Sequence, residues 1–442
     1  MTIVNVNATT ERSALRPNMT ILIRGDRIED IRPTTEADLI LLDSDQKTPK
    51  VGVRNDSRVI DGRGLFAIPG LIDTHVHLEW EGQEALMFRL FLANGVTAIL
   101  EAGNPSPKVY VWRRQSQEPA FVGPRMEVCG PIMTGPPAAW NGMTVLTSVA
   151  QVRSAIAVRA TGGARFAKIY AQLPPELSVD VINAAQRRGL RVMGHLGRTN
   201  ALEATAFGIN IITHLSGVPD SAVPDPEAVR AQHALGFSAG WQATNAAWKQ
   251  ATPAGLNQLI QHMVANRVAL SPTLWYQKVF ATLNEDTPEK REALQFGHVP
   301  SAISKDWNHF TMDVGDPKIY KEAWPFQKKF VKAFHDAGGM VIAGTDTANQ
   351  YVSPGFGLHQ EIETLHEAGL SNLEALKSAT VFASRAMGTE QNYGSIEIGN
   401  HADVVLLGGN PLDDLKNARQ IVTVIRSGLI YSPRQLLSTL PK

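Results

Sequence analysis

The sequence contains very little cysteine: Cys129 is the single one among 442 residues. One thiol excludes an internal disulfide, and it excludes every zinc site built on three or four cysteines. A metal bound by this chain must therefore be held by histidine, aspartate, glutamate or a modified side chain. A chain without disulfides also suits a reducing compartment, so we expect a cytoplasmic protein.

The sequence also lacks an excess of charge of either sign. Lys and Arg together number 42, and so do Asp and Glu. The chain therefore lacks the excess of positive charge that is typical of proteins that coat nucleic acid or an acidic membrane. No apolar stretch is long enough to cross a bilayer, and residues 1–7 do not begin a signal peptide. We expect no nucleic-acid or membrane partner and a small-molecule or short peptide-like substrate; a homo-oligomer stays open.

The length of the chain predicts two structural units. A chain of 442 residues exceeds the usual size of one hydrophobic core, so we expect one large domain and one smaller domain. Polar and apolar residues alternate over 20–31, 402–407 and 421–431, which predicts strands near both termini. Neither set is long enough for an independently stable sheet. We therefore expect a small β-sandwich domain built from both termini, with its parts at 1–65 and 389–442.

The middle of the chain, 66–388, alternates short apolar runs with amphipathic segments of helical length, as βα units around a parallel sheet do. Eight candidate strands end near His77, Glu101, Met133, Ile169, His195, His214, Thr273 and Asp346. Helices are predicted over 84–94, 148–159, 175–188, 200–207, 253–266, 325–337, 357–368 and 372–387. The predicted fold class is α/β, a (β/α)8 TIM barrel. Its long connections, 217–252 and 276–324, are where lids and specificity loops usually lie.

One of the candidate strands ends in a His-x-His pair, His75 and His77. Successive strand side chains face opposite ways, so both imidazoles project to the same side, which in a barrel can be the interior. Single ionisable residues end other apolar runs: Lys168, His195, His214 and Asp346. Each one alone is weak, but all six fall at the strand ends where barrel enzymes place their sites. The joint pattern predicts a metal site.

With these residues the sequence resembles the amidohydrolase superfamily, in its binuclear branch related to imidazolonepropionase and prolidase. The resemblance covers nearly the whole length. It also rests on Gly25-Asp26-Arg27-Ile28, on Val59-Ile60-Asp61-Gly62 and on the stretch from Gly394 to Val405. It implies a metal-dependent hydrolase that cleaves the C–N bond of an amide or cyclic amide with a metal-bridging hydroxide.

The resemblance also implies the role of each site residue. It implies one cation held by His75, His77 and Asp346 and a second cation held by His195 and His214. Lys168 would bridge the two, which requires N6-carboxylation (carbamylation) by CO₂ because an ammonium cannot ligate a metal. Asp346 would also be catalytic, taking the proton of the attacking water and passing it to the leaving nitrogen. Zn²⁺ is the expected ion at both positions, with Mn, Co and Fe as alternatives.

Alternatives stay open within the same fold. A mononuclear deaminase commonly has an acidic residue three positions after the fifth-strand histidine, where this sequence has Arg198. A lactonase or phosphotriesterase fits the same two cations. An inactive scaffold usually loses ligands, whereas this sequence keeps all six. Dipeptide cleavage is not favoured, because the stretch after Lys168 lacks the Ser-Gly-Gly of carboxypeptidase-like relatives.

Substrate-binding residues are unknown from the sequence. Tyr170 follows the fourth strand, where it could contact a substrate oxygen or simply pack. Aromatic residues in the long connections either form a substrate wall or fix the loops to the barrel: Trp275, Tyr276, Trp307 and Trp324. His359 follows the eighth strand, and we expect it on a solvated helix face.

Overall fold

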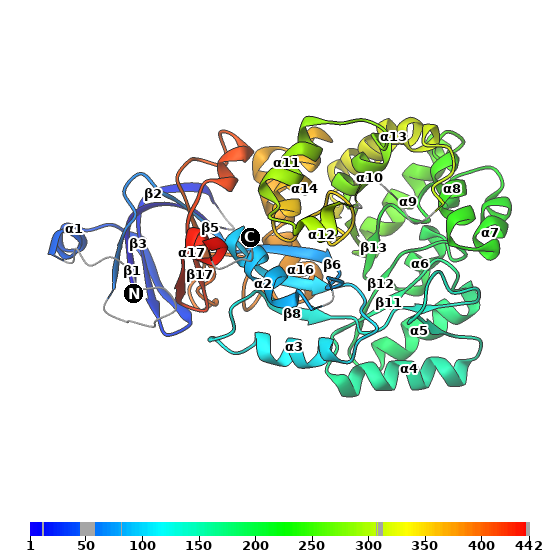
Figure 1. The fold of residues 1–442 in the computed structure, drawn as a ribbon, viewed down its shortest axis with the longest axis horizontal. Helices are drawn as coiled ribbons and strands as arrows, with labels where there is room; N and C mark the ends of the chain where they lie inside the picture. The colour runs from blue at the N-terminus through cyan, green and yellow to red at the C-terminus, as the bar shows by residue number, and fades with distance from the viewer. Residues whose placement is uncertain (11–12, 45–57, 81, 306, 308–312, 439–442) are drawn as a thin grey trace.

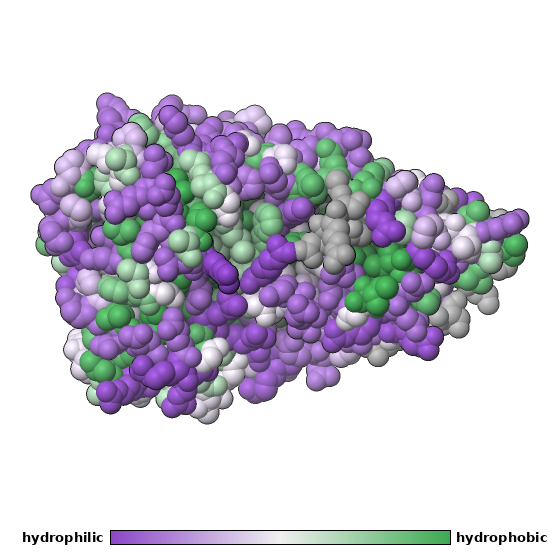
Figure 2. Space-filling model, turned by 180° about the vertical axis from the view of Figure 1, so that it is seen from behind, coloured by the Kyte–Doolittle hydropathy of each residue, from purple (hydrophilic) through white to green (hydrophobic). Residues whose placement is uncertain are grey.

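The computed structural model of the protein describes residues 1–442 except 11–12, 45–57, 81, 306, 308–312 and 439–442. The chain has a mixed α/β fold, with a β-rich part at one end and a larger part of strands and helices at the other (Figure 1). Within the described residues, no helix has both the length and the apolar character needed to cross a lipid bilayer. Polar residues cover much of the face shown in Figure 2 and separate its apolar groups.

The β-rich part is a sheet of eight strands drawn from both ends of the chain. The strands are β1 (Thr2–Thr10), β2 (Ser13–Arg24), β3 (Arg27–Pro33), β4 (Val59–Asp61), β5 (Phe66–Pro69), β16 (Val404–Leu407), β17 (Ile421–Arg426) and β18 (Leu429–Tyr431). Their order is β18-β17-β16-β5-β1-β2-β3, with β4 beside β1. Because β5 pairs with both β1 and β16, the two ends of the chain share one hydrogen-bonded sheet. The strands expected over 20–31 and 421–431 are confirmed, and in each range they pair as an antiparallel hairpin.

A separate apolar cluster lies within this small part. It joins Ile3, Ile21 and Ile28 of the first three strands to Val404 and Ile425 of β16 and β17, all at most 2% exposed. Strands from both termini therefore bury their side chains against each other, which neither set could do alone.

A buried ion pair connects the small part to the larger one. Arg125, the first residue of β8 (Arg125–Val128), donates through Nε and Nη2 to the two carboxylate oxygens of Asp403, at 3.1 and 3.2 Å. The backbone N–H of Ser427 donates to the same carboxylate at 2.7 Å. Burial acts to raise the pKa of Asp403, but the charges of Arg125 and Arg426 and these hydrogen bonds bring it below its usual value.

The strands described in the larger part pair only in parallel. Besides β8 they are β6 (Leu71–Val76), β7 (Val96–Glu101), β9 (Met133–Thr134), β10 (Thr144–Val145), β11 (Phe166–Ile169), β12 (Arg191–Gly194), β13 (Ile211–Thr213), β14 (Ala269–Ser271) and β15 (Met340–Val341). One sheet has the order β10-β9-β11-β12-β13-β14-β15, and the other has the order β6-β7-β8. The backbone N–H of Thr74 donates to the carbonyl of Ala343 at 3.0 Å, so β6 lies beside the segment that follows β15.

Helices lie between most of these strands and after the last of them. They are α2 (Glu84–Ala93), α3 (Lys108–Ser116), α4 (Val149–Gly162), α5 (Pro175–Gln186), α6 (Ala201–Phe207), α7 (Pro226–Leu235), α8 (Phe237–Ala247), α9 (Pro253–Ala265), α10 (Leu274–Ala281), α11 (Pro288–Phe296), α12 (Ser301–Ser304), α13 (Lys318–Asp336), α14 (Phe356–Glu367), α15 (Asn372–Ser378), α16 (Val381–Met387) and α17 (Pro433–Ser438). The β-rich part adds α1 (Glu36–Ser44), which the sequence pattern did not predict, and short 3₁₀ turns occur at Pro219–Ser221 and Leu415–Arg419.

Two predicted helices differ from the structure. The helix expected to start at Pro325 begins at Lys318, because the buried side chains of Tyr320 and Ala323 anchor turns ahead of the proline. The helix expected over 372–387 is interrupted at Thr380, which has φ −137° and ψ −97°. Its hydroxyl donates to the carbonyl of Leu376 at 2.8 Å and so replaces part of the helical bonding.

Apolar side chains of the parallel strands meet in one further cluster. Ile72 of β6, Ala98 of β7, Phe166 of β11, Ile211 of β13 and Ala269 of β14 all belong to it. Because strands from both sheets contribute, the sheets enclose a common core. The carboxyl-terminal ends of these strands are the places where the predicted site residues occur.

Candidate metal centre and active site

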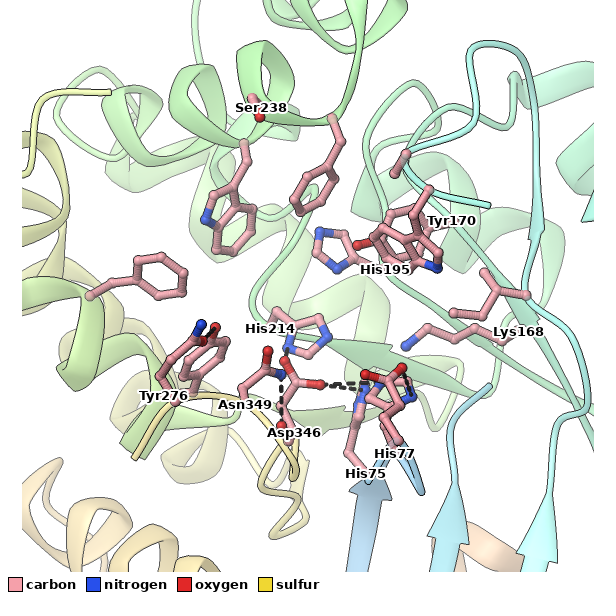
Figure 3. Close-up of a pocket in the computed structure, with 18 of the residues that line it drawn as sticks. His75, His77, Lys168, Tyr170, His195, His214, Ser238, Tyr276, Asp346 and Asn349 are labelled. Carbon is pink, nitrogen blue, oxygen red and sulfur yellow. Dashed lines mark hydrogen bonds and ion pairs between the residues drawn. The ribbon is translucent and has the colours of Figure 1, made fainter. Parts of the chain in front are cut away.

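The six predicted site residues line one cavity of about 650 Å³ (Figure 3). His75 lies in β6 and Lys168 in β11, whereas the others follow the ends of strands: His77 after β6, His195 after β12, His214 after β13 and Asp346 after β15. Parallel strands end on the same side of a sheet, which is why residues far apart in sequence converge here. All but His77 are at most 9% exposed.

Asp346 is the residue around which the histidines gather. Its Oδ1 is 3.3 Å from Nε2 of His75 and 3.3 Å from Nε2 of His77, and its Oδ2 is 4.0 Å from Nδ1 of His214. The rings of His214 and His195 have centroids 4.7 Å apart, so His195 continues the group. One ligand atom from each of His75, His214 and Asp346 lies within 4.8 Å of the other two, a spacing that can hold a metal ion.

Lys168 reaches the same cluster from β11. It is 1% exposed, and its Nζ donates to Oγ1 of Thr213 at 3.1 Å. Burial lowers the pKa of Lys168 to about 8, against the partly compensating charges of Asp346 and Glu101. A lysine in this state has a substantial neutral-amine population near neutral pH.

Three of the histidines are held in the neutral form. Burial and the nearby positive charge of Lys168 place the pKa values of His75, His195 and His214 well below the usual value. For His77 burial acts in the same direction, but the hydrogen bond to Asp346 and the charges of nearby carboxylates raise its pKa to about 9. Neutral imidazole is the form that ligates metals, so His77 would release its proton on binding a cation, whereas the other three are already neutral.

Several polar atoms in the cluster have no hydrogen-bond partner. Among the described residues, both ring nitrogens of His75 and Nε2 of His195 are buried without one, and Nε2 of His75 lies 3.3 Å from Oδ1 of Asp346. Buried polar atoms are normally satisfied, so orphaned imidazole nitrogens beside a carboxylate need an explanation. A metal ion, which accepts the lone pair of a neutral imidazole nitrogen, would satisfy Nε2 of His75 beside Asp346.

The backbone at two site residues is held in an uncommon conformation. His214 and Asp346 have φ of 60° and 65°, in the left-handed region that non-glycine residues seldom adopt. Thr273, itself at φ 49°, hydrogen-bonds through Oγ1 to Nδ1 of His214 at 2.9 Å. Asp73 accepts from Oγ1 of Thr345 at 2.7 Å and so anchors the loop that carries Asp346.

Sequence reasoning missed these supporting residues and most of the cavity wall. Trp140, Phe237, Trp241 and Phe280 line the cavity together with Tyr276. A signal existed for two of them: Phe237 and Trp241 are aromatic residues four apart within the long connection 217–252, a spacing that puts both on one helix face.

For several aromatic residues the sequence left open whether they contact the substrate or only pack, and the structure places some in the cavity lining and others outside it. Tyr170 and Tyr276 line the cavity. Trp275 instead donates from Nε1 to the carbonyl of Tyr351 at 2.8 Å, and neither Trp307 nor Trp324 is among the lining residues. His359 is 2% exposed, and its Nε2 is 3.0 Å from the carbonyl of Asn94, so the solvated position expected for it is wrong. Arg198 does not line the cavity.

The fold and the site agree with a family assignment. The model of the Amidohydrolase family matches residues 66–430, and the chain belongs to this family.

Two curated relatives match over short stretches. A dihydroorotase of Lactococcus lactis subsp. lactis is 37% identical over 68 residues, which cover 15% of this chain and 16% of the relative. A dihydroorotase of Anaeromyxobacter dehalogenans is 32% identical over 96 residues, which cover 20% of this chain and 22% of the relative. The chain thus matches less than a quarter of the length of either relative.

Solved structures match over almost the whole chain. A candidate prolidase from Bifidobacterium longum has a TM-score of 0.72 at 23% identity, with 99% of this chain and 98% of that chain covered. A Xaa-Pro dipeptidase with bound methionine in its active site has a TM-score of 0.69 at 20% identity, with coverage of 98% and 99%. Bottromycin amidohydrolase has a TM-score of 0.67 at 20% identity, with coverage of 99% and 88%. At these identities the likeness establishes the shared fold.

Proposed function

We propose that the protein is a metal-dependent hydrolase that cleaves the C–N bond of an amide or cyclic amide. The observation that carries this proposal is the convergence of four histidines, a lysine and an aspartate on one cavity, with buried imidazole nitrogens that lack partners among the described residues. Neutral imidazole together with carboxylate is a ligand set that divalent cations, zinc above all, prefer.

The donor set fits two divalent cations, with Zn²⁺ as the first choice. One would be held by His75, His77 and Asp346 and the other by His195 and His214. Lys168, N6-carboxylated by CO₂, would supply an oxygen to each. Its buried Nζ and its pKa of about 8 support this, because the neutral amine is the form that attacks CO₂. When bound, the cations would share a water, lower its pKa toward neutrality and polarise the substrate oxygen.

The residues of the chain itself would position and move protons. Asp346 would accept the proton of the attacking water and deliver it to the departing nitrogen. The contacts of its Oδ1 with His75 and His77 fix the carboxylate at the cavity floor, and Thr273 fixes the ring of His214 beside it. A positioned proton shuttle of this kind contributes about 10²–10⁴-fold in rate.

A substrate panel tests this proposal. Protein loaded with Zn²⁺, Mn²⁺ or Co²⁺ is assayed on N-acyl amines, cyclic amides, lactones and phosphotriesters, with Asp346→Asn as the matched blank. We expect hydrolysis of an amide or cyclic amide, with kcat reduced about 10²–10⁴-fold in the variant. Turnover of lactones or phosphotriesters alone would refute C–N cleavage, and full activity in Asp346→Asn would refute the shuttle.

We also infer the finer architecture that supports this chemistry. The parallel strands would close into a (β/α)8 barrel over 66–388, which the hydrogen bond between Thr74 and Ala343 and the shared inner cluster support. The segments 1–65 and 389–442 would form a small β-sandwich domain around their own apolar cluster. We infer a cytoplasmic protein, which its single cysteine, buried as Cys129, suits.

A further inference from the structure

One side of the cavity is a continuous wall of aromatic rings. Neighbouring ring centroids are 4.8–6.4 Å apart along the series Trp140, Tyr170, Phe237, Trp241, Phe280 and Tyr276, which we name the aromatic wall. The wall reaches the metal-ligand candidates at His195, whose ring is 4.6 Å from that of Tyr170 and 5.3 Å from that of Trp241. A substrate bound at His195 would therefore lie against aromatic faces.

Four of the six wall residues are at most 8% exposed and are therefore fixed by packing before any substrate arrives: Tyr170, Trp241, Phe280 and Tyr276. Phe237 and Trp241 stack with an angle of 8° between their rings on α8. A buried polar group anchors that helix: His233 is 3.2 Å from Asp220 and 3.0 Å from Thr244. Binding a ring against a preformed wall requires little ordering of side chains, so the wall favours a substrate with an aromatic or bulky apolar group.

The charges around the cavity are acidic outside the metal-ligand candidates. Among the described residues, Glu79 and Asp313 are the other charged ones that line it. In the described part of the chain, Lys168 is the sole lysine or arginine of the lining, and it lies on the floor with its Nζ bonded to Thr213. A substrate carboxylate that lies at the rim, and not against the cations proposed for the floor, would thus meet like charges, and no guanidinium or ammonium among the described lining residues would pair with it there.

We propose that this site selects an amide that carries an aromatic group and no free carboxylate beside the scissile bond. This inference deepens, and rests on, the proposed C–N hydrolase function. A cationic substrate is attracted both by the faces of the aromatic wall and by the carboxylates of the rim. A neutral aromatic substrate packs against the wall and is not repelled by those carboxylates. A dipeptide carries the carboxylate that the rim disfavours, so the inference sets this chain apart from dipeptidases of similar fold.

The test compares two amides that differ by one carboxylate, N-benzoyl-phenethylamine and N-benzoyl-phenylalanine. On zinc-loaded protein we expect kcat/KM for the neutral amide to be at least about 10-fold higher, a difference of about 1.4 kcal/mol. Binding is measured separately, without turnover, from the fluorescence quenching of Trp140 and Trp241 in zinc-loaded Asp346→Asn protein. The neutral amide should bind at least about 10-fold more tightly there too.

Four variants, two of them controls, connect the preference to the residues named. Glu79→Gln should narrow the difference between the two amides, whereas Glu118→Gln, at an exposed position away from the cavity lining, should leave it unchanged. Trp241→Leu should weaken binding of the neutral aromatic amide by about 2- to 12-fold, and Trp241→Phe should restore most of the affinity.

The outcomes separate the inference from the proposed function. If the neutral amide binds more tightly but no amide is hydrolysed, the hydrolase proposal fails and the inference about selectivity stands. If N-benzoyl-phenylalanine is hydrolysed and bound as well as the neutral amide or better, the inference is overturned and the hydrolase proposal stands. Absence of quenching by both amides also overturns the inference.

Discussion

Replacing Lys168 by methionine should remove most of the activity, because the proposed bridge between the cations needs a carboxylated amine. The lowered pKa of Lys168 determines how much of its side chain is the neutral amine that reacts with CO₂. Lowering the pKa from 10.5 to about 8 raises the neutral-amine fraction below pH 8 about 300-fold over that of an ordinary lysine. At pH 7 about one side chain in ten is then the free amine.

Activity and metal content after CO₂ removal form the assay. Wild-type protein, demetallated and reloaded with Zn²⁺ in CO₂-free buffer, should regain little activity until bicarbonate is added. Lys168→Met should not respond to bicarbonate, and a short carboxylic acid added to it should restore part of the activity by supplying the missing oxygens. Lys290 is a matched control, since it is 3% exposed, has a pKa lowered by burial and does not line the cavity.

The reasoning about Lys168 is refuted by either of two results. Lys168→Met protein with wild-type activity and metal content would show that no bridge is needed. A wild-type protein that regains full activity without CO₂, with an unchanged mass, would show that Lys168 acts as a free amine. A bicarbonate response in wild type and in Lys290→Met, but not in Lys168→Met, is the result that the structure predicts.

Three further predictions concern the supports of the site and of the fold. Asp73→Asn weakens the hydrogen bonds that hold Thr345, next to the proposed ligand Asp346. It should reduce metal affinity about 10- to 100-fold, as measured by chelator competition. Unchanged affinity would exclude Asp73 as a support of the site. Arg125→Leu leaves Asp403 buried without its main partner and should lower the free energy of unfolding by about 3–5 kcal/mol in urea titration, whereas Arg63→Leu in an exposed pair should cost about 0–1 kcal/mol. The pKa of Asp403 is lower in the folded state than its usual value, which applies to the unfolded chain. The ion pair with Arg125 therefore stabilises the fold fully at pH values above the usual pKa. This stabilisation is lost as the pH falls through the folded-state pKa. The penalty of Arg125→Leu should accordingly be larger at neutral pH than in acid, and an equal penalty at both would contradict the linkage.

The candidate site was predictable because it depends on strand ends. His75 and His77 share a strand face by simple alternation, and His195 and His214 each follow an apolar run directly. Parallel strands then bring these positions together whatever the loops do. The left-handed backbone at His214 and Asp346 could not be anticipated, since neither residue type requires it.

The aromatic wall of the cavity was not predictable, because its position depends on how a long connection folds and not on where strands end. Phe237 and Trp241 lie on α8, and the direction of that helix depends on the buried contacts of His233 with Asp220 and Thr244, three positions spread over a long connection. His359 illustrates the same limit. Helical spacing alone does not say that α14 buries this residue against Asn94, because that contact joins segments far apart in the sequence.

The metal content of purified protein tests the central claim most directly. After dialysis against Zn²⁺ and removal of the excess, elemental analysis should give about two equivalents per chain in wild type and about one in His195→Ala. A wild-type protein that is folded by circular dichroism and retains no zinc at saturating supply would contradict the claim that these side chains form a metal centre.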